Sequence, residues 1–260
     1  MANFLALLQT DAALLQCQLA RLAVDSPLAA IPDAPVGVGY FQSNDVLLRK
    51  RPFAGPSPFS LARDVSSECL VVATGAASAG AYSEESTSPF RFRHWLWAYA
   101  GAHEAVADVQ PTLLASLPDH LQRQLAGSSA AEALFLSFLE ALRGGGQPTD
   151  DLELDLPGAA KALGSTLEKV SSPLAVCATN GRALLAAGRG VPLSYTLLEG
   201  LLPCPVHGLD ERAADLRDNV RAHRMAKAVA LTSRAAEGSW IAVPDGRVVT
   251  ISRMLQVAVL

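Results

Sequence analysis

The sequence lacks any concentrated positive charge. It holds 21 lysine and arginine residues against 25 aspartate and glutamate residues, for a formal net charge of -4, and its densest basic stretch is "LRKRP" at residues 48–52. Proteins that bind nucleic acid generally carry a basic patch that neutralises phosphates. The charge pattern therefore predicts that nucleic acid is not a partner.

The sequence is also poor in cysteine, and its four cysteines stand far apart. Cys17, Cys69, Cys177 and Cys204 include no C-x-x-C pair, and no secretory signal peptide is recognisable. This pattern is typical of a cytoplasmic protein with reduced thiols. We therefore expect a cytoplasmic protein without disulfides.

One short motif raises the question of a metal site. Cys204 and His207 form "CPVH", which is one half of a possible metal-binding pattern. No second well-spaced pair occurs in the sequence, so we interpret Cys204 as a loop cysteine. The sequence thus predicts no bound metal and no cofactor.

No long hydrophobic run stands near the N-terminus. Residues 4–8 (FLALL) are apolar, but the run is far shorter than a membrane span or the core of a signal peptide, and no lysine or arginine precedes it. Thr10 and Asp11 follow, as is typical of a buried strand that leads into a helix. Chain ends usually fray, so such a strand must be held by the fold. We expect residues 3–8 inside a sheet, and no membrane association.

The 260 residues, half of them hydrophobic, suffice for a full core, and we expect a single domain over residues 1–260. Apolar patterns and turn residues predict strands or hairpins at residues 36–42, 45–50, 68–75, 94–101, 173–190 and 238–260. Leucine and phenylalanine spacing predicts helices at residues 12–23, 110–125, 129–145 and 156–170. This order of elements predicts two antiparallel sheets with helical layers outside them.

Several short motifs occur in order along the chain. The motifs are "PVGVGYF" at residues 35–41, "LVVATG" at 70–75, "STSPF" at 86–90, "WLWAYAG" at 95–101, "GSSAAEALF" at 127–135 and the C-terminal hairpin "WIAVPDGRVVTI" at 240–251. In their order and spacing they resemble the class II glutamine amidotransferases, an N-terminal nucleophile family, in their stand-alone form. The resemblance covers nearly the whole chain and implies an α+β fold, a four-layer αββα sandwich. It also implies a reason for the N-terminal strand, because the family's nucleophile stands at the start of the chain and must be anchored in a sheet.

The positions that carry this family's chemistry hold residues that cannot perform it. In the family, an N-terminal thiolate attacks the glutamine amide, and an Asn-Gly pair binds the resulting oxyanion. The matching residues are Ala2, Ala100 and Gly101, so the thiol and the amide side chain are missing while the glycine N–H remains. The resemblance therefore implies a degenerate catalytic site.

The substrate clamps are missing as well. The family's arginine for the substrate carboxylate matches Val71, its aspartate for the substrate ammonium matches Ala130, and the histidine of its Thr-His-Pro-Phe loop matches Ser88. Binding glutamine without these partners would desolvate two charges at a cost of several kcal/mol. We therefore expect a pseudoenzyme that acts as a scaffold or regulatory subunit with a protein partner or as a homo-oligomer. Residues 76–88 and 210–227 are the expected interaction surfaces.

Two alternatives stay open. One is an active class II glutamine amidotransferase in which Ala2 is an inactivating change, although the joint loss of the other groups argues against it. The other is a repurposed enzyme or ligand sensor that uses Cys69, Tyr99, His103 or Glu132 near the old cleft. The simpler interpretations are a buried hydrophobic thiol for Cys69, a capping or solvent-facing side chain for His103, and a helix-start residue for Glu132.

Overall fold

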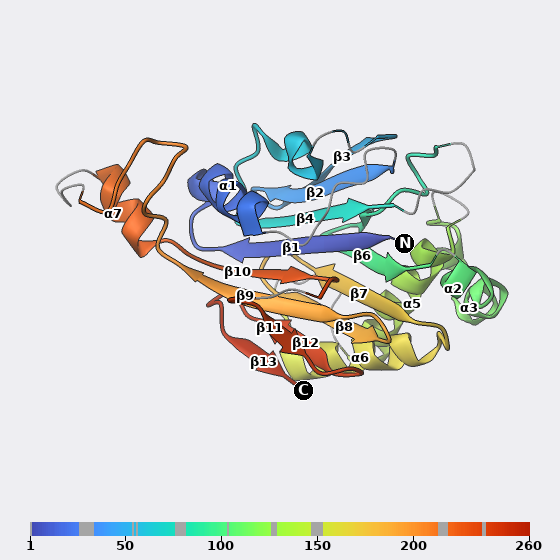
Figure 1. Cartoon of the computed structure of the whole chain (residues 1–260). Helices are drawn as coiled ribbons and strands as arrows, with labels where there is room; N and C mark the ends of the chain where they lie inside the picture. Colours follow the sequence, from blue (N-terminus) through green and yellow to red (C-terminus); the bar gives the residue numbers. More distant parts are fainter. Residues whose placement is uncertain are drawn as a thin grey trace.

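Two antiparallel β-sheets lie face to face at the centre of the molecule (Figure 1). The computed structural model describes residues 2–25, 34–53, 55, 57–75, 82–102, 104–125, 129–146, 153–212, 218–235 and 238–260. Within these residues, one sheet has seven strands in the order β11-β9-β10-β1-β4-β2-β3, and the other has six in the order β13-β12-β8-β7-β6-β5. In chain order, the strands are β1 (Asn3–Gln9), β2 (Val36–Gln42), β3 (Asp45–Arg51), β4 (Cys69–Thr74), β5 (Phe90–Phe92), β6 (Trp95–Gly101), β7 (Leu174–Thr179), β8 (Leu184–Arg189), β9 (Leu193–Glu199), β10 (Lys227–Thr232), β11 (Ile241–Val243), β12 (Val248–Ile251) and β13 (Val257–Val259).

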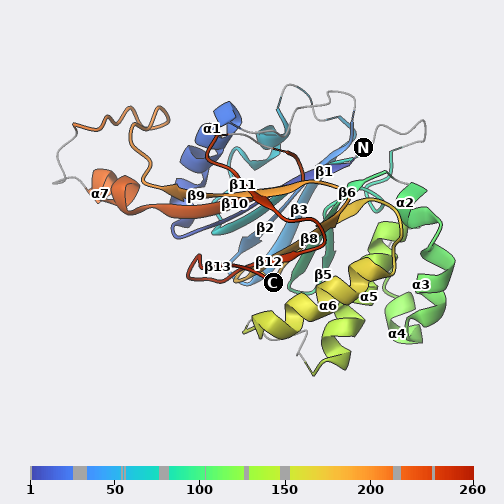
Figure 2. The same ribbon diagram turned by 60° about the horizontal axis from the view of Figure 1, so that its bottom comes forward.

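Helices cover the outer faces of both sheets (Figure 2). α5 and α6 pack on the six-stranded sheet, while α1 and the short 3-10 helix η2 pack on the seven-stranded sheet. The helices are η1 (Ala12–Leu14), α1 (Leu15–Asp25), η2 (Pro58–Ala62), α2 (Glu104–Ala107), α3 (Gln110–Ser116), α4 (Asp119–Gln122), α5 (Ala130–Gly144), α6 (Leu156–Glu168) and α7 (Asp218–Met225). This layering confirms the expected four-layer αββα sandwich. Among the described helices, none has both the length and the apolar character needed to cross a bilayer.

β1 lies in the middle of the seven-stranded sheet, between β10 and β4. Because side chains alternate along a strand, Phe4, Ala6 and Leu8 enter the core between the two sheets, which we call the inter-sheet core. Leu5 and Leu7 face the opposite way, into the core beneath α1. Each of these residues is 2 % exposed or less. The expectation that residues 3–8 lie inside a sheet is confirmed.

Small residues line the space between the sheets. Ala98 and Ala100 of β6 and Ala175 of β7 are fully buried there. On β2, a Cβ atom added to Gly37 would lie 2.2 Å from the carbonyl oxygen of Ser88. The loop before β5 therefore packs directly against the backbone of β2, at a distance that only glycine permits.

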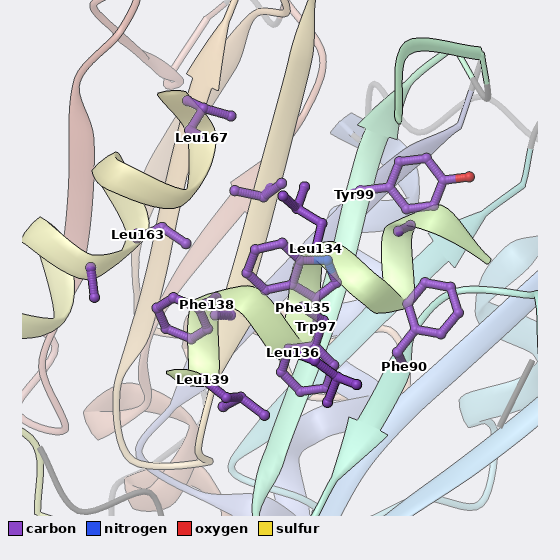
Figure 3. Close-up of a cluster of buried hydrophobic side chains, with 14 of the residues drawn as sticks. Phe90, Trp97, Tyr99, Leu134, Phe135, Leu136, Phe138, Leu139, Leu163 and Leu167 are labelled. Atoms are coloured by element: carbon purple, nitrogen blue, oxygen red, sulfur yellow. The ribbon is translucent and has the colours of Figure 1, made fainter. Parts of the chain in front are cut away.

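Aromatic rings join β6 to α5 on the outer face of the six-stranded sheet, in a cluster that we call the helix-side core (Figure 3). The ring centroids of Trp97 lie 5.5 Å from Phe135, in a stacked arrangement, and 5.4 Å from Phe138. Trp95 meets Phe138 edge to face at 5.5 Å. Such pairs add to the free energy gained by burying the rings, so this cluster fixes α5 on the sheet.

Two expectations from the sequence are wrong in detail. The strands on either side of "VPDG" form no hairpin, because β11 pairs with β9 in one sheet and β12 pairs with β8 in the other. The turn instead carries the chain between the sheets, and Asp245 there accepts a hydrogen bond from the N–H of Gly190 at 2.7 Å.

The helix expected at residues 110–125 is divided into α3 and α4. Leu117 takes an extended conformation (φ -82, ψ 139), which a following proline, here Pro118, favours in its neighbour.

The aromatic cluster generates a stability prediction. Trp97→Ala should lower the free energy of unfolding by about 3–5 kcal/mol, because it removes a fully buried ring and leaves a cavity. Phe53→Ala is the control, since Phe53 is 60 % exposed, and it should change that free energy by less than about 0.5 kcal/mol. Urea denaturation followed by circular dichroism measures both. Equal losses in the two variants would contradict the packing described here.

Candidate functional site

Ala2 joins the two sheets at one end of the sandwich. Its N–H donates to the carbonyl oxygen of Gly101 at 3.0 Å, and the N–H of Gly101 donates to the carbonyl oxygen of Ala2 at 3.2 Å. Because Ala2 precedes β1 and Gly101 ends β6, this antiparallel bridge connects the seven-stranded sheet to the six-stranded one. Gly101 has a φ of +145°, a conformation that L side chains rarely adopt, and a Cβ there would lie 2.9 Å from the carbonyl oxygen of Pro173.

The bridge occupies a backbone donor that the resemblance assigns to amide hydrolysis. The Gly101 N–H is present, as the sequence indicated, but it is not free to meet an oxyanion because the Ala2 carbonyl oxygen accepts it. Ala2 is 2 % exposed and belongs to the helix-side core. This end of the fold therefore supplies neither a nucleophile at residue 2 nor a free glycine donor.

The other positions singled out by the resemblance lie in separate parts of the core. Val71 of β4 and Ala100 of β6 belong to the inter-sheet core. Ala130 begins α5 and lies in the helix-side core, as Ala2 does. Ser88 is 3 % exposed, and its hydroxyl has no hydrogen-bond partner among the described residues. These positions do not form one polar pocket.

A cavity of about 430 Å³ lies beside the bridge. It is lined by Ala2, Asn3, Gly101, Pro173, Gly190, Val191, Pro192, Ser233, Arg234 and Ala235. Arg234 is the charged residue of this described lining, and the Ser233 hydroxyl already accepts the N–H of Phe4 at 2.8 Å. The described lining contains no thiol, imidazole or carboxylate, so it offers no nucleophile with a general base beside it.

Cys69 lies at the opposite end of β4 from the bridge. It pairs with Leu8 of β1, whereas Asn3, next to Ala2, pairs at the other end of the strand. Its sulfur is 3.4 Å from the Thr179 hydroxyl and borders a separate cavity of about 270 Å³. Burial raises the pKa of this thiol to about 12, although the Thr179 hydrogen bond opposes the shift. The thiol is therefore protonated at neutral pH and is a poor nucleophile.

The remaining candidates do not converge on the cavity either. Tyr99 is 7 % exposed in the helix-side core, and Glu132 is 7 % exposed in the first turn of α5. A carboxylate at that end of a helix interacts favourably with the helix dipole, which agrees with the helix-start interpretation of Glu132. Neither residue lines the cavity beside Ala2. His103 lies outside the described residues.

Lys50 is a titratable residue that the sequence did not single out. Its Nζ donates to the carbonyl oxygen of Glu84 at 2.8 Å and lies 5.7 Å from the centroid of the Phe90 ring. Burial lowers the pKa of Lys50 to about 8, although the charges of Glu84 and Glu132 oppose the shift. These contacts fasten the described part of residues 76–88 to β3, which gives this lysine a structural role.

Four possible metal ligands meet beside α1. Cys17 on α1, Cys204 and His207 in the loop after β9, and His223 on α7 place one ligand atom each within 4.8 Å of one another. The sequence revealed only the pair Cys204 and His207 and predicted no metal. The other two ligands stand singly on helices, and Cys17 is 190 positions from His207, so no local spacing pattern could have revealed the group.

The fold has counterparts among solved structures. A glutamine aminotransferase class-II domain protein from Silicibacter pomeroyi aligns with a TM-score of 0.58 and 17% identity, over 99% of this chain and 98% of that one. A predicted glutamine amidotransferase from Pseudomonas aeruginosa aligns with a TM-score of 0.58 and 16% identity, over 99% and 95%. The glutamine phosphoribosylpyrophosphate amidotransferase of B. subtilis aligns with a TM-score of 0.53 and 13% identity, over 99% of this chain and 48% of that one.

Sequence comparison adds no closer relative. No family model matches the sequence, and no curated protein matches it either. The similarity to the solved structures, at 17% identity or less, concerns the fold, and it extends over almost the full length of this chain. The chain therefore has the fold of the class II glutamine amidotransferase domains, as its motifs implied.

Proposed function

We propose that this chain is a pseudoenzyme, a glutamine amidotransferase-like protein without glutaminase activity, which acts in the cytoplasm as a protein-binding scaffold or regulatory subunit. The bridge between Ala2 and Gly101 carries the proposal. The resemblance assigns the nucleophile to residue 2, and Ala2 offers only a buried methyl group there. Its carbonyl oxygen also accepts a hydrogen bond from the Gly101 N–H, which is the one oxyanion donor that the sequence retains.

The loss of the substrate clamps supports the same proposal. Val71 and Ala130 stand at the positions that the resemblance assigns to the arginine and the aspartate, and both are buried among apolar side chains. The carboxylate and ammonium groups of glutamine would lose their hydration without gaining partners from these residues. A variant that restores one of these groups, such as the thiol at residue 2, would therefore still lack the oxyanion amide and the clamps for the substrate.

The edges of the two sheets offer surfaces for a protein partner. Ile241 on the edge strand β11 is 46% exposed, Val259 on the edge strand β13 is 41% exposed, and Leu197 on β9 is 53% exposed. Met254, near β13, is 79% exposed. Edge strands carry unpaired backbone groups, and exposed apolar residues beside them favour association with another chain. This surface supports a protein partner or a second copy of the chain.

A second candidate function is a ligand sensor. The cavity of about 430 Å³ beside the bridge falls within the range of about 300–1,000 Å³ that small-molecule sites occupy. Its largely apolar lining and the guanidinium of Arg234 suit a ligand with an apolar body and one anionic group. A stoichiometric small molecule recovered from the purified protein by native mass spectrometry, without a protein partner, would favour the sensor over the scaffold.

The first prediction from the proposed function concerns glutamine hydrolysis. Neither the wild-type chain nor Ala2→Cys should release ammonia or glutamate from glutamine above the buffer blank. The restored thiol would still lack the oxyanion donor and the clamps, and one missing oxyanion donor alone costs about 10²–10³ in rate. An active glutaminase assayed in parallel and circular dichroism of Ala2→Cys are the controls. Strong activity in Ala2→Cys would instead support an active enzyme that Ala2 silences.

The second prediction separates the scaffold from a repurposed thiol enzyme. In the native protein at neutral pH, iodoacetamide should leave Cys69 unmodified, because the thiol is 1 % exposed and its pKa is about 12. In urea the same cysteine should be alkylated within the same labelling time. Peptide mapping by mass spectrometry measures both states, and Cys69→Ser confirms the assignment of the peptide. Rapid alkylation of Cys69 in the native state would instead support the repurposed enzyme, with Cys69 as its nucleophile.

The third prediction concerns the partner. Affinity purification of the tagged chain from its native cells should recover a stoichiometric protein partner or an untagged second copy. The double variant Ile241→Glu, Val259→Glu should reduce that recovery, because it places charge on the edge strands β11 and β13. Phe53→Glu is the matched control, since Phe53 is exposed in the loop after β3, and it should leave recovery unchanged. A monomer without any protein partner would count against the scaffold.

A further inference from the structure

The atoms of the Cys17, Cys204, His207 and His223 group surround one point between α1, the loop after β9 and α7. Cys17 Sγ lies 3.2 Å from His207 Nδ1 and 3.5 Å from His223 Nε2. His207 Nδ1 lies 3.7 Å from Cys204 Sγ and 3.1 Å from His223 Nε2. Two sulfur atoms and two ring nitrogens are therefore directed at a shared centre.

These separations match the ligands of one tetrahedral ion. Zinc lies about 2.3 Å from a thiolate sulfur and about 2.0–2.1 Å from an imidazole nitrogen. Tetrahedral angles then put a sulfur and a nitrogen about 3.5 Å apart, and two nitrogens about 3.3 Å apart. The three sulfur-to-nitrogen separations of 3.2, 3.5 and 3.7 Å and the nitrogen-to-nitrogen separation of 3.1 Å agree with these values to a few tenths of an ångström.

The second nitrogen of His223 is already oriented as in a metal ligand. His223 Nδ1 contacts the carbonyl oxygen of Asn219, one turn earlier on α7. A carbonyl oxygen only accepts hydrogen bonds, so Nδ1 carries the proton and Nε2 presents its lone pair to the cluster. Metal-ligating histidines are commonly held in this way, with the other ring nitrogen donating to a backbone carbonyl.

The loop that carries Cys204 and His207 is closed by its own backbone. The N–H of Cys204 donates to the carbonyl oxygen of Leu209 at 2.8 Å, and the N–H of Leu209 donates back at 3.0 Å. The N–H of Leu201 donates to the carbonyl oxygen of His223 at 2.8 Å, which ties α7 to the same loop. Three of the four ligands are thus positioned by hydrogen bonds that do not involve a metal.

We propose that Cys17, Cys204, His207 and His223 bind one zinc ion as a structural site. Two thiolates and two imidazoles are a donor set typical of tetrahedral structural zinc, and four protein ligands leave no open position for a substrate. Cys17, Cys204 and His223 are buried while His207 is exposed, so the metal enters from the side of His207. The thiols release their protons to solvent when the metal binds.

The zinc ion fastens the loop after β9 and helix α7 to α1. In Figure 1, α7 stands out beside α1 from the body of the sandwich. The hydrophobic cluster beneath it is small: its buried members are Leu14, Cys17, Leu201, Cys204 and Ala226. Burial of a cluster of this size contributes little free energy to holding α7 and the loop on α1. The metal cross-link supplies the remaining stabilisation. The site lies past the end of β1 opposite Ala2 and is separate from the cavity there.

Metal content of the purified full chain tests the proposal. Protein produced in medium that contains zinc, iron and copper, and purified with a phosphine reductant and no chelator, should hold one zinc ion per chain by inductively coupled plasma mass spectrometry. Cys17→Ser and His223→Gln should each lose this stoichiometric zinc. Cys177→Ser is the matched control, because Cys177 is 1 % exposed, as buried as the proposed ligands, but lies in the inter-sheet core, and it should keep the zinc.

Three further measurements test the proposal even if a buried variant fails to fold. His207→Ala alters an exposed side chain, and it should weaken zinc affinity by more than about 100-fold, since changes in residues behind the ligands already cost about 10–100-fold. Cobalt(II) added to the metal-free wild-type chain should produce the visible bands of tetrahedral cobalt with thiolate ligands. Chelation of the wild-type chain should speed trypsin cleavage between residues 200 and 226.

Several outcomes would overturn the proposal. A wild-type chain that holds no zinc and takes up none on titration would do so, as would stoichiometric iron or copper in place of zinc. Full zinc occupancy in Cys17→Ser would assign the metal to another site. A disulfide between Cys17 and Cys204 in protein taken from cells under alkylating conditions would replace the metal site with a covalent bond.

Discussion

The backbone pairing of β1 is the constraint on which the rest of the structure depends. β1 is hydrogen-bonded to β10 on one side and to β4 on the other, and the residue before it bridges to the end of β6 in the second sheet. A strand with both edges paired and both faces buried places its side chains in two cores at once. The sandwich, the bridge at Ala2 and the position of α1, which follows β1 almost directly, all follow from that placement.

The bridge between Ala2, next to β1, and Gly101 connects the fold to the proposed function. In the family that the motifs resemble, a nucleophile at the position of residue 2 and an oxyanion donor on the strand from the second sheet would have to face a substrate. Here Ala2 and Gly101 meet each other instead, through two backbone hydrogen bonds. These bonds hold the sheets together at the place where the chemistry would occur. The proposed loss of catalysis is thus compatible with an intact architecture, because the bridge uses backbone groups, which position 2 keeps with any side chain and position 101 keeps as long as it is glycine.

Much of the fold could be predicted because its signals are local. The apolar run at residues 4–8 marks β1, and the turn at Ser43, where φ is 58°, marks the hairpin of β2 and β3. The turn "VPDG" was misread because a turn signal does not say whether the flanking strands pair with each other. β11 and β12 find their partners in different sheets, which depends on strands far away in the sequence.

The candidate sites also divide into residues that a local sequence pattern reveals and residues that only the tertiary structure brings together. The alanines at positions 2, 100 and 130 could be identified from motifs, because each motif is a short, contiguous piece of sequence. The Gly101 N–H could not be judged from sequence, since its availability depends on what another strand accepts. The Cys17 and His223 ligands were missed for a related reason. Each is a single residue on a helix, 206 positions from the other, and only tertiary packing brings them to Cys204 and His207.

The central place of β1 also has a consequence for the synthesis of the chain. The Phe4 N–H is bonded to the Ser233 hydroxyl, 229 positions later, so β10 emerges from the ribosome long after β1. Until then one edge of β1 has no partner, although β4 can already pair with its other edge. An unpaired strand of sequence FLALL is a template for pairing with other nascent chains. That edge of β1 therefore stays open to such pairing until β10 has been synthesised and the native sheet closes.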